Sequence, residues 1–166
     1  MNYCNDSGNM KLHLATTGDI PLLASHHRRM FEEIWEQKGL VLEAANAKEV
    51  ENAYIEKLKK EIPAGTCKAW VVQENDQAVA SGAISIVSYV PVPSDVNHSA
   101  AYLHSMYTEK EFRGKKYARQ IIAGALEFCK KNRISRVVLN ASDAGRPLYE
   151  KLGFTSSPET MRMFIQ

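Results

Sequence analysis

Four cations crowd the start of a predicted helix in the stretch EFRGKKYAR, residues 111–119. They are Arg113, Lys115, Lys116 and Arg119. A helix N-terminus carries partial positive charge, so each cation at such an exposed site costs roughly 0.3–1 kcal/mol. The first turn also has backbone N–H groups without intrahelical partners, and these groups, the dipole and the side-chain charges all favour an anion. The stretch therefore predicts a site for a multiply charged anion such as a diphosphate, which Gly114 lets the backbone approach closely.

A solvated, slightly basic turn is the alternative interpretation of these residues, and the charge pattern alone leaves both open. The position between a predicted strand and a predicted helix favours the anion site. Two common phosphate-binding loops are excluded, because G-x-x-x-x-G-K-[ST] does not occur and because Gly114 stands without the further glycines of a dinucleotide-binding loop.

Hydrophobic periodicity predicts the elements that must hold this site. The first half of the chain is expected to form a strand, two helices and a hairpin of two strands, at residues 11–15, 20–39, 46–63, 67–73 and 78–90. Thr17 or Asp19 is expected to cap the first helix, and Asn46 with Glu49 the second. The second half is expected to form a strand, a helix, a strand, a brief helix and a final strand, at residues 100–108, 115–131, 136–140, within 141–154, and 161–165.

This order of elements predicts an α/β protein with a mixed sheet, because strands and helices do not alternate regularly. The 166 residues suit one compact domain, which we expect to span residues 10–166 after a loose tail at 1–9.

The composition indicates a cytoplasmic globular protein. With 21 basic and 19 acidic residues the net charge is +2, which is too balanced for a general nucleic-acid or membrane-surface binder. Three cysteines without a C-x-x-C pair predict reduced thiols, not a disulfide framework or a metal site. No segment approaches the ~20 apolar residues that span a bilayer, and the polar first residues lack the layout of a signal peptide. We therefore expect no metal, no nucleic-acid partner and no membrane partner.

Two segments resemble motifs of the GCN5-related N-acetyltransferase (GNAT) superfamily. Residues 113–118, RGKKYA, are similar to the family's pyrophosphate motif [RQ]-x-x-G-x-[GA], with Lys116 in place of the usual second glycine. Residues 141–154, ASDAGRPLYEKLGF, resemble the family's N-x-x-A-x-x-L-Y-E-K-x-GF, with Ser142 and Gly145 in the usual Asn and Ala places. The order of predicted elements agrees over residues 11–166. Two motifs in the right order, ~30 residues apart, make the resemblance specific.

The resemblance implies the GNAT fold and acetyl-CoA as the acetyl donor. In the family, the strand before the first motif separates from its neighbour, and its backbone pairs with the pantetheine arm as an added strand would. Carried over, this role falls on Met106, Tyr107 and Thr108. Ser142 takes the place of the Asn that contacts the pantetheine amides. The diphosphate would be held by Arg113, Gly114, Lys115, Lys116, Tyr117, Ala118 and Arg119, and Arg146 is a further CoA-contacting candidate.

The resemblance also assigns chemistry to Tyr149, which matches the family tyrosine that protonates the CoA sulfur. A phenol with a pKa of about 10 suits this task, and a structural tyrosine in the core is the alternative. The backbone N–H of Tyr107 or Thr108 is expected to stabilise the oxyanion. Together these features imply an N-acetyltransferase that acts on a primary amine of a small molecule or peptide.

His104 is the candidate general base, because some arylalkylamine-acetylating relatives carry a histidine at this place. Its spacing is expected to put it on one strand face with Met106 and Thr108. An ordinary pKa of about 6.5 suits proton removal, directly or through water. A partly buried, hydrogen-bonded histidine without a catalytic role is the alternative. Tyr102 stands where other relatives place a glutamate, so no carboxylate base is evident.

Other interpretations stay open at this point. Glu32, Glu33 and Glu36 precede the loop that usually borders the acceptor pocket in the family, where they would attract a cationic amine or form a solvated helix face. A non-catalytic CoA-binding regulatory module is the alternative function, because Lys116 departs from the motif. An RNA-binding surface on the basic cluster is disfavoured by the near-neutral net charge. A homodimer is compatible with all of these.

Overall fold

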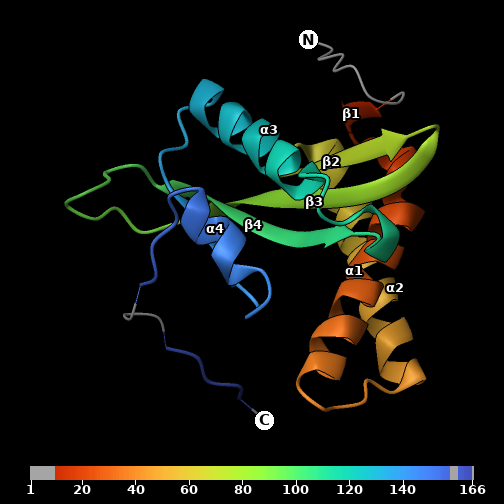
Figure 1. Cartoon of the computed structure of the whole chain (residues 1–166). Coiled ribbons are helices and arrows are strands. Elements are labelled where there is room, and N and C mark those ends of the chain that lie inside the picture. The colour runs from red at the N-terminus through yellow and green to blue at the C-terminus, as the bar shows by residue number, and fades with distance from the viewer. Residues whose placement is uncertain (1–9, 158–160, 166) are drawn as a thin grey trace.

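A computed structural model describes residues 10–157 and 161–165 of the chain (Figure 1). Its strands and helices are β1 (Met10–Leu14), α1 (Ile20–Gln37), α2 (Ala44–Ala64), β2 (Cys67–Glu74), β3 (Gln77–Ser88), β4 (Ser99–Thr108), α3 (Tyr117–Lys131), β5 (Val137–Leu139) and α4 (Arg146–Lys151). Short 3-10 turns precede α1 and α3, at η1 (Thr17–Asp19) and η2 (Lys110–Phe112). The expected tail at 1–9 lies outside the described residues.

Within the described residues, five strands form one mixed sheet in the order β1-β2-β3-β4-β5. The strands β1 to β4 pair antiparallel with their neighbours, whereas β4 and β5 run parallel. The hairpin between β2 and β3 turns through Asn75 and Asp76, whose φ angles of 51° and 62° suit a two-residue turn that follows the twist of the strands. The predicted mixed α/β sheet is confirmed.

Helices cover the sheet on both faces, with α1 and α2 on one face and α3 with α4 on the other (Figure 1). Side chains alternate along β2, so Trp70 and Val72 pack beneath α3 while Ala69 and Val71 face α1 and α2. In α3, Ile121 is fully buried, and burial of such a side chain contributes about 1.5–3 kcal/mol. This packing fixes the start of α3 beside the end of β4.

The helix caps agree in part with the sequence expectation. Asp19 is the N-cap residue of α1, as expected, but its side chain makes no capping bond to that helix. The capping bonds belong to η1, where Thr16 is the N-cap: its hydroxyl accepts from Gly18 N–H at 3.3 Å, and Asp19 Oδ2 accepts from Thr16 N–H at 2.8 Å. The capping box predicted at Asn46 is wrong, because α2 already begins at Ala44 and its N-cap makes no side-chain bond. A capping pattern in sequence competes with the packing of the whole helix, which decides where the first turn forms.

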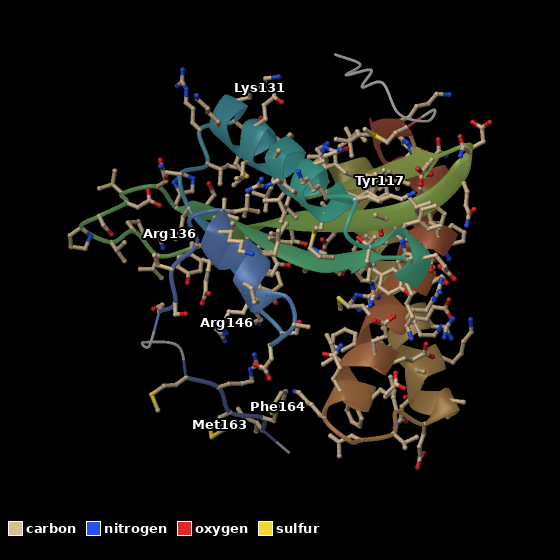
Figure 2. All side chains as sticks on the ribbon, viewed as in Figure 1. Tyr117, Lys131, Arg136, Arg146, Met163 and Phe164 are labelled. Atoms are coloured by element: carbon tan, nitrogen blue, oxygen red, sulfur yellow. The ribbon has the colours of Figure 1, made fainter. Side chains whose placement is uncertain are left out.

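The strand predicted at residues 161–165 is wrong. This segment is irregular, and its apolar side chains are 81–94% exposed, at Met161, Met163, Phe164 and Ile165. Figure 2 shows Met163 and Phe164 outside the packed layers. Alternating apolar residues form a strand only where another strand supplies hydrogen-bond partners, and the adjacent candidate, β5, is three residues long.

None of the helices in residues 10–157 is long and apolar enough to cross a membrane.

Candidate active site

The later part of β4 has an open edge. The pairing of β4 with β5 ends at Leu103 and Leu139, although β4 continues to Thr108. Glu109 N–H donates to Val79 O at 2.9 Å, on the β3 side. Backbone groups alternate sides along a strand, so residues 106 and 108 turn their N–H and C=O toward the open edge. An unpaired edge of this kind accepts an extended ligand backbone as an added strand.

Tyr107 does not share this orientation. Its backbone faces β3, where it pairs with Ser81 in the sheet register, so the expectation that residue 107 also offers its N–H to a ligand is not met in this structure. Its side chain lies on the α1 face, where the hydroxyl donates to Glu33 Oε1 at 3.2 Å. The open edge therefore offers Met106 and Thr108.

A β-bulge interrupts β4 where this edge begins. Ser105 and Met106 together oppose Gly82 of β3, and Ser105 has a φ of 55°. Met106 packs over Gly82 so closely that a Cβ added to this glycine would lie 2.2 Å from Met106 Sδ and 2.9 Å from Ile121. The bulge thus turns residue 106 to the α3 face.

His104 consequently faces the other way, toward α2, where its ring meets Tyr54 edge-on at 5.9 Å between centroids. The expectation that His104 shares a face with Met106 and Thr108 is therefore wrong. The extra residue of the bulge shifts the two-residue alternation on which that expectation rested.

The loop before α3 has the geometry of an anion site. Gly114 and Lys116 are left-handed, with φ angles of 82° and 67°, and Lys116 is the N-cap of α3 without a side-chain capping bond. The N–H groups of residues 114–119 donate to no acceptor in the described part of the chain. A non-glycine residue in this conformation costs roughly 1–2 kcal/mol. Lys116 nevertheless adopts the conformation, so the N–H groups stay exposed to a ligand.

Two of the four cations in this loop pair with carboxylates of distant elements among the described residues. Arg113 Nη2 lies 2.7 Å from Glu33 Oε2 on α1, and Arg113 Nε donates to Thr108 O at 3.0 Å. Lys115 Nζ lies 2.9 Å from both oxygens of Glu74 on β2, and this hydrogen bond lowers the pKa of Glu74. Lys116 and Arg119, by contrast, form no ion pair with any described residue. An incoming anion can therefore pair at once with Lys116 and Arg119. It can pair with Arg113 and Lys115 only after each has broken its ion pair with a carboxylate.

Tyr149 lies on α4, half-buried against the α3-side core. Its ring meets Phe154 edge-on at 5.8 Å between centroids, and its hydroxyl has no hydrogen-bond partner among residues 10–157 and 161–165. Burial raises the pKa of Tyr149 to about 12. The hydroxyl is thus protonated and uncommitted.

The residues around Tyr149 have local bonds of their own. Ser142 Oγ accepts from Gly145 N–H at 3.2 Å and so shapes the turn that begins α4. Arg146 Nη1 donates to Ser156 Oγ at 3.1 Å, on the outer side of α4 (Figure 2). Both residues lie near Tyr149 in the sequence, but the side chain of each forms its hydrogen bond within the local segment.

The His104 ring is hydrogen-bonded through both nitrogens. Nε2 lies 3.0 Å from Ser85 Oγ on β3, and Nδ1 lies 2.9 Å from Ser105 Oγ in the bulge. Burial, assisted by Lys57 and His27, lowers the pKa of His104 to about 3. The expectation of an ordinary pKa is therefore wrong, and the ring is neutral at physiological pH. An imidazole with so low a pKa binds a proton weakly and is therefore a weak general base.

His27 belongs to the same cluster, although nothing in its sequence position on α1 indicates this. Its Nδ1 lies 2.8 Å from Ser105 Oγ, and its ring stacks on Tyr54 at 3.9 Å between centroids. Burial lowers the pKa of His27 to about 4. Ser105, which bonds both histidines, lies in the bulge, and no sequence pattern predicts this bulge. Contacts between α1, β3 and β4 thus create a feature that periodicity cannot find.

A cavity of about 470 Å³ opens between α1, the segment after it and the end of β4. Its lining combines carboxylates with apolar groups, at Glu32, Glu33, Glu36, Leu40, Val41, Leu42 and Tyr107, together with Arg29 and Lys110. The three glutamates singled out in the sequence therefore share one cavity.

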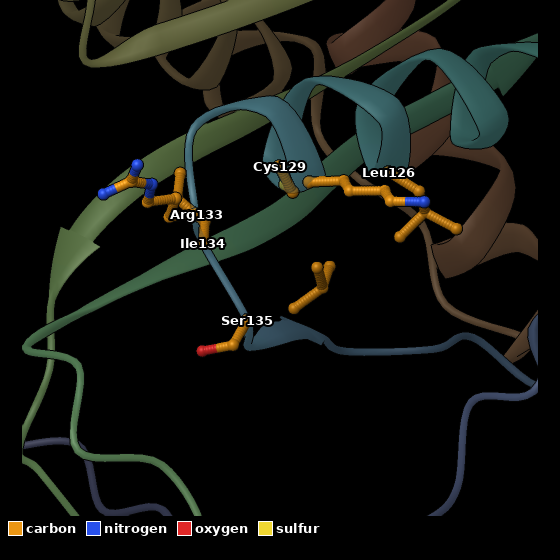
Figure 3. Close-up of a pocket in the computed structure, with 7 residues that line it drawn as sticks. Leu126, Cys129, Arg133, Ile134 and Ser135 are labelled. Atoms are coloured by element: carbon orange, nitrogen blue, oxygen red, sulfur yellow. The ribbon is translucent and has the colours of Figure 1, made fainter.

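A second cavity of similar volume lies between the end of α3 and β5 (Figure 3). Its lining includes Leu126, Cys129 and Val137. It lies at the opposite end of α3 from the anion loop, so it is not part of the same site.

Comparisons with known proteins agree on one family. A family model described as an acetyltransferase (GNAT) domain matches residues 35–164. The structure of a predicted acetyltransferase with acetyl-CoA from Clostridium acetobutylicum is similar, with 24% identity, a TM-score of 0.83, and coverage of 93% of this chain and 96% of that chain. A GCN5-related N-acetyltransferase from Ralstonia eutropha JMP134 shows 20% identity, a TM-score of 0.84 and coverage of 94% and 99%. Glucosamine-6-phosphate N-acetyltransferase from Arabidopsis thaliana shows 18% identity, a TM-score of 0.61 and coverage of 95% and 99%. No curated protein matches the chain.

Proposed function

Because the chain belongs to the acetyltransferase (GNAT) family, we propose that it transfers the acetyl group of acetyl-CoA to the primary amine of a small molecule or peptide. One observation carries the proposal: the open edge of β4 leads to the unpaired N–H groups at the start of α3. An edge that accepts an extended amide chain, followed by a site for a diphosphate, matches the order of these groups in CoA.

The residues of this chain fit acetyl-CoA, which supplies an activated acetyl thioester when bound. Met106 would hold an amide of the pantetheine arm through its backbone groups, and the N–H of Thr108 stays available for the acetyl group, because the Thr108 carbonyl accepts from Arg113. The N–H groups of residues 114–119 would hold the diphosphate, with Lys116 and Arg119 adding charge. Arg113 and Lys115 would also contact the diphosphate, after each replaces its ion pair with a carboxylate by one with a phosphate.

Two groups of the protein would then serve the transfer. Tyr149 donates its phenolic proton to the departing sulfur, and its raised pKa of about 12 ensures that the proton is present at neutral pH. The backbone N–H of Thr108 donates to the acetyl oxygen as negative charge develops there. The acceptor amine must also lose a proton, for which the neutral His104 is a poor final acceptor.

The acidic cavity favours a cationic acceptor. Glu36 would attract an ammonium group, because Glu32 and Glu33 already pair with Arg28 and Arg113, while the apolar residues 40–42 would contact its carbon skeleton. The similar Arabidopsis protein is named for N-acetylation of an amino sugar phosphate, which supports nitrogen as the atom acetylated.

Release of free thiol from acetyl-CoA, measured across a panel of small amines and peptides, tests the proposal. We expect thiol release that depends on the amine, together with CoA binding in calorimetry. CoA binding without thiol release would instead favour a non-catalytic regulatory module. Absence of CoA binding by the folded protein would overturn both.

A further inference from the structure

One carboxylate, that of Glu33, belongs to both candidate binding sites. It lines the cavity beside α1 in which we place the acceptor, and it also pairs with Arg113 of the anion loop, whose Nη2 lies 2.7 Å from Glu33 Oε2. The hydroxyl of Tyr107 on β4 donates to the other oxygen, Oε1, at 3.2 Å. The two oxygens of Glu33 therefore have different partners, one from the loop and one from the strand.

Arg113 is placed where it can change partners. Its Nε donates to Thr108 O at 3.0 Å, and this hydrogen bond keeps the guanidinium beside the open edge of β4 even without Glu33. The Arg113 side chain is 45% exposed, so water screens its ion pair with Glu33 and the pair is weak. A diphosphate carries more negative charge than one carboxylate and offers oxygens for two hydrogen bonds from a guanidinium. The diphosphate of CoA would therefore take Arg113 from Glu33.

The other charges of the cavity balance one another in this structure. Two further ion pairs neutralise lining residues, Arg29 with Glu109 and Glu32 with Arg28. The charged lining residues that form no ion pair within residues 10–157 and 161–165 are Glu36 and Lys110, whose charges are opposite. While Glu33 is paired, the cavity thus has no excess of negative charge. It gains such an excess when Arg113 leaves.

We propose that Glu33 makes the cavity specific for cationic amines by exchanging Arg113 for the ammonium group of the acceptor when CoA binds. This inference rests on the proposed acetyl transfer. The ion pair between Arg113 and Glu33 breaks, Arg113 pairs with a phosphate of CoA, and Glu33 Oε2 pairs with the ammonium group. The amine binds in its protonated form and loses the proton in a later step. Neither Arg113 nor Glu33 is left unpaired once both ligands are bound.

Tyr107 keeps Glu33 in place during this exchange. Tyr107 is buried, and this burial raises its pKa to about 12, so the hydroxyl remains a proton donor to Oε1 at neutral pH. Glu33 therefore keeps one hydrogen bond when Arg113 leaves, and Oε2 is the oxygen that becomes available. Its side chain is only 17% exposed, and a largely buried carboxylate that has lost its cation strongly favours a new one. CoA and the amine should consequently tighten each other's binding, because coupling between two ligands is reciprocal.

Calorimetry with n-hexylamine tests the exchange in the full chain. This probe carries an ammonium group and an apolar chain that suits residues 40–42, and 1-hexanol is its uncharged analogue. We expect saturating CoA to lower the dissociation constant of hexylamine about 10-fold in the wild-type protein at low ionic strength. The binding of 1-hexanol should not depend on CoA, because it carries no charge for Glu33.

Two variants separate the exchange from damage to the fold, because they change hexylamine binding in opposite directions. Arg113→Gln leaves Glu33 without its guanidinium, so hexylamine should bind without CoA about as tightly as it binds the wild-type protein with CoA. Glu33→Gln removes the carboxylate, so hexylamine should bind weakly with and without CoA. In both variants the effect of CoA on hexylamine binding should disappear.

Glu51→Gln is the matched control. The Glu51 side chain is 15% exposed, nearly the same as that of Glu33, and it pairs with Arg28 at 3.5 Å and Lys48 at 2.9 Å without lining the cavity. The full effect of CoA on hexylamine binding should remain in this variant. Thermal unfolding of each variant establishes that it is folded.

Three outcomes would overturn the exchange. They are a hexylamine affinity of the wild-type protein that does not depend on CoA, weak binding of hexylamine to Arg113→Gln, and an effect of CoA that persists in Glu33→Gln. If the protein still releases thiol from acetyl-CoA in the presence of amines, these outcomes leave acetyl transfer intact. A wild-type protein that does not bind CoA would overturn the exchange and the proposed function together, so the two failures are distinguishable.

Discussion

The anion loop at the start of α3 and the histidine cluster around His104 adjoin the same strand but differ in their exposure to water and in their charge. In the loop, Arg113 and Lys115 have side chains that are 45% and 47% exposed and carry full charges. In the cluster, Ser85 is 6% exposed and the imidazoles are neutral. Charge exposed to water acts over a distance and is screened by salt, whereas a buried network acts only through contact. The two regions should therefore respond to different perturbations. Salt should weaken ligand binding at the anion loop, whereas the loss of a single hydroxyl or a fall in pH should disrupt the histidine cluster.

The largest expected effect lies at Tyr149 on α4, which belongs to neither region. Tyr149→Phe removes the proton donor for the sulfur, and we expect kcat to fall about 100-fold. The dissociation constant of CoA, measured by calorimetry, should change less than twofold, because the anion loop is untouched. Tyr89→Phe is the control, since Tyr89 is exposed on the surface and is distant from Tyr149 in the sequence. A variant with the wild-type kcat at every pH would exclude Tyr149 as the acid.

The histidine cluster should make the protein sensitive to acid. The folded-state pKa of His104 is about 3, below its unfolded value near 6.5, so the unfolded chain takes up the proton first as pH falls. Stability is therefore full above pH 6.5 and declines below it, by about 2 kcal/mol for this residue at pH 5. Urea unfolding of wild type and His104→Gln at pH 7 and pH 5 measures the contribution.

The difference between the two pH values should be about 2 kcal/mol smaller in His104→Gln than in wild type. Comparing pH values within each protein cancels the cost of the substitution itself. An unchanged difference would show that the His104 ring protonates freely, and the contrast with the loop would then be wrong.

The anion loop should respond to salt. Arg113→Ala combined with Lys115→Ala should weaken CoA binding about tenfold at low ionic strength and flatten its dependence on salt. Calorimetry at 0.05 and 0.5 M NaCl measures both quantities. Unchanged affinity would remove the diphosphate from this loop.

Glu33 supplies the matched comparison. In this structure Glu33 holds Arg113, so Glu33→Gln should leave CoA binding equal or tighten it, in contrast to a loss at Arg113. Weaker binding in Glu33→Gln would mean that the ion pair shapes the loop for its ligand.

The smallest expected effect concerns the backbone of the loop. Lys116→Gly removes the cost of a left-handed non-glycine residue and should stabilise the fold by up to about 1 kcal/mol in urea unfolding. Lys115→Gly is the control and should destabilise, because φ is not positive at residue 115. Equal losses in the two variants would contradict the strain at Lys116.

These regions also differ in how far the sequence predicts them. The loop is one continuous stretch, so its cations, Gly114 and the helix that follows can be found by inspection. Periodicity likewise predicts the elements of the sheet and its helices, because side-chain alternation is local. The histidine cluster draws on four elements and on the bulge at Ser105, and its contacts depend on the packing of helices against the sheet. The failed strand at 161–165 has the same cause, since strand pairing needs a partner that the segment itself does not specify.

The close contact between Gly82 and Met106 has a consequence for how the sheet assembles. Any side chain at position 82 would displace Met106 and press on Ile121, so this position of β3 tolerates the methionine only as glycine. Glycine at position 82 therefore favours the alignment of β3 and β4 in which Met106 lies over it, and that alignment contains the bulge. A residue without a side chain thus helps to determine where β4 bends.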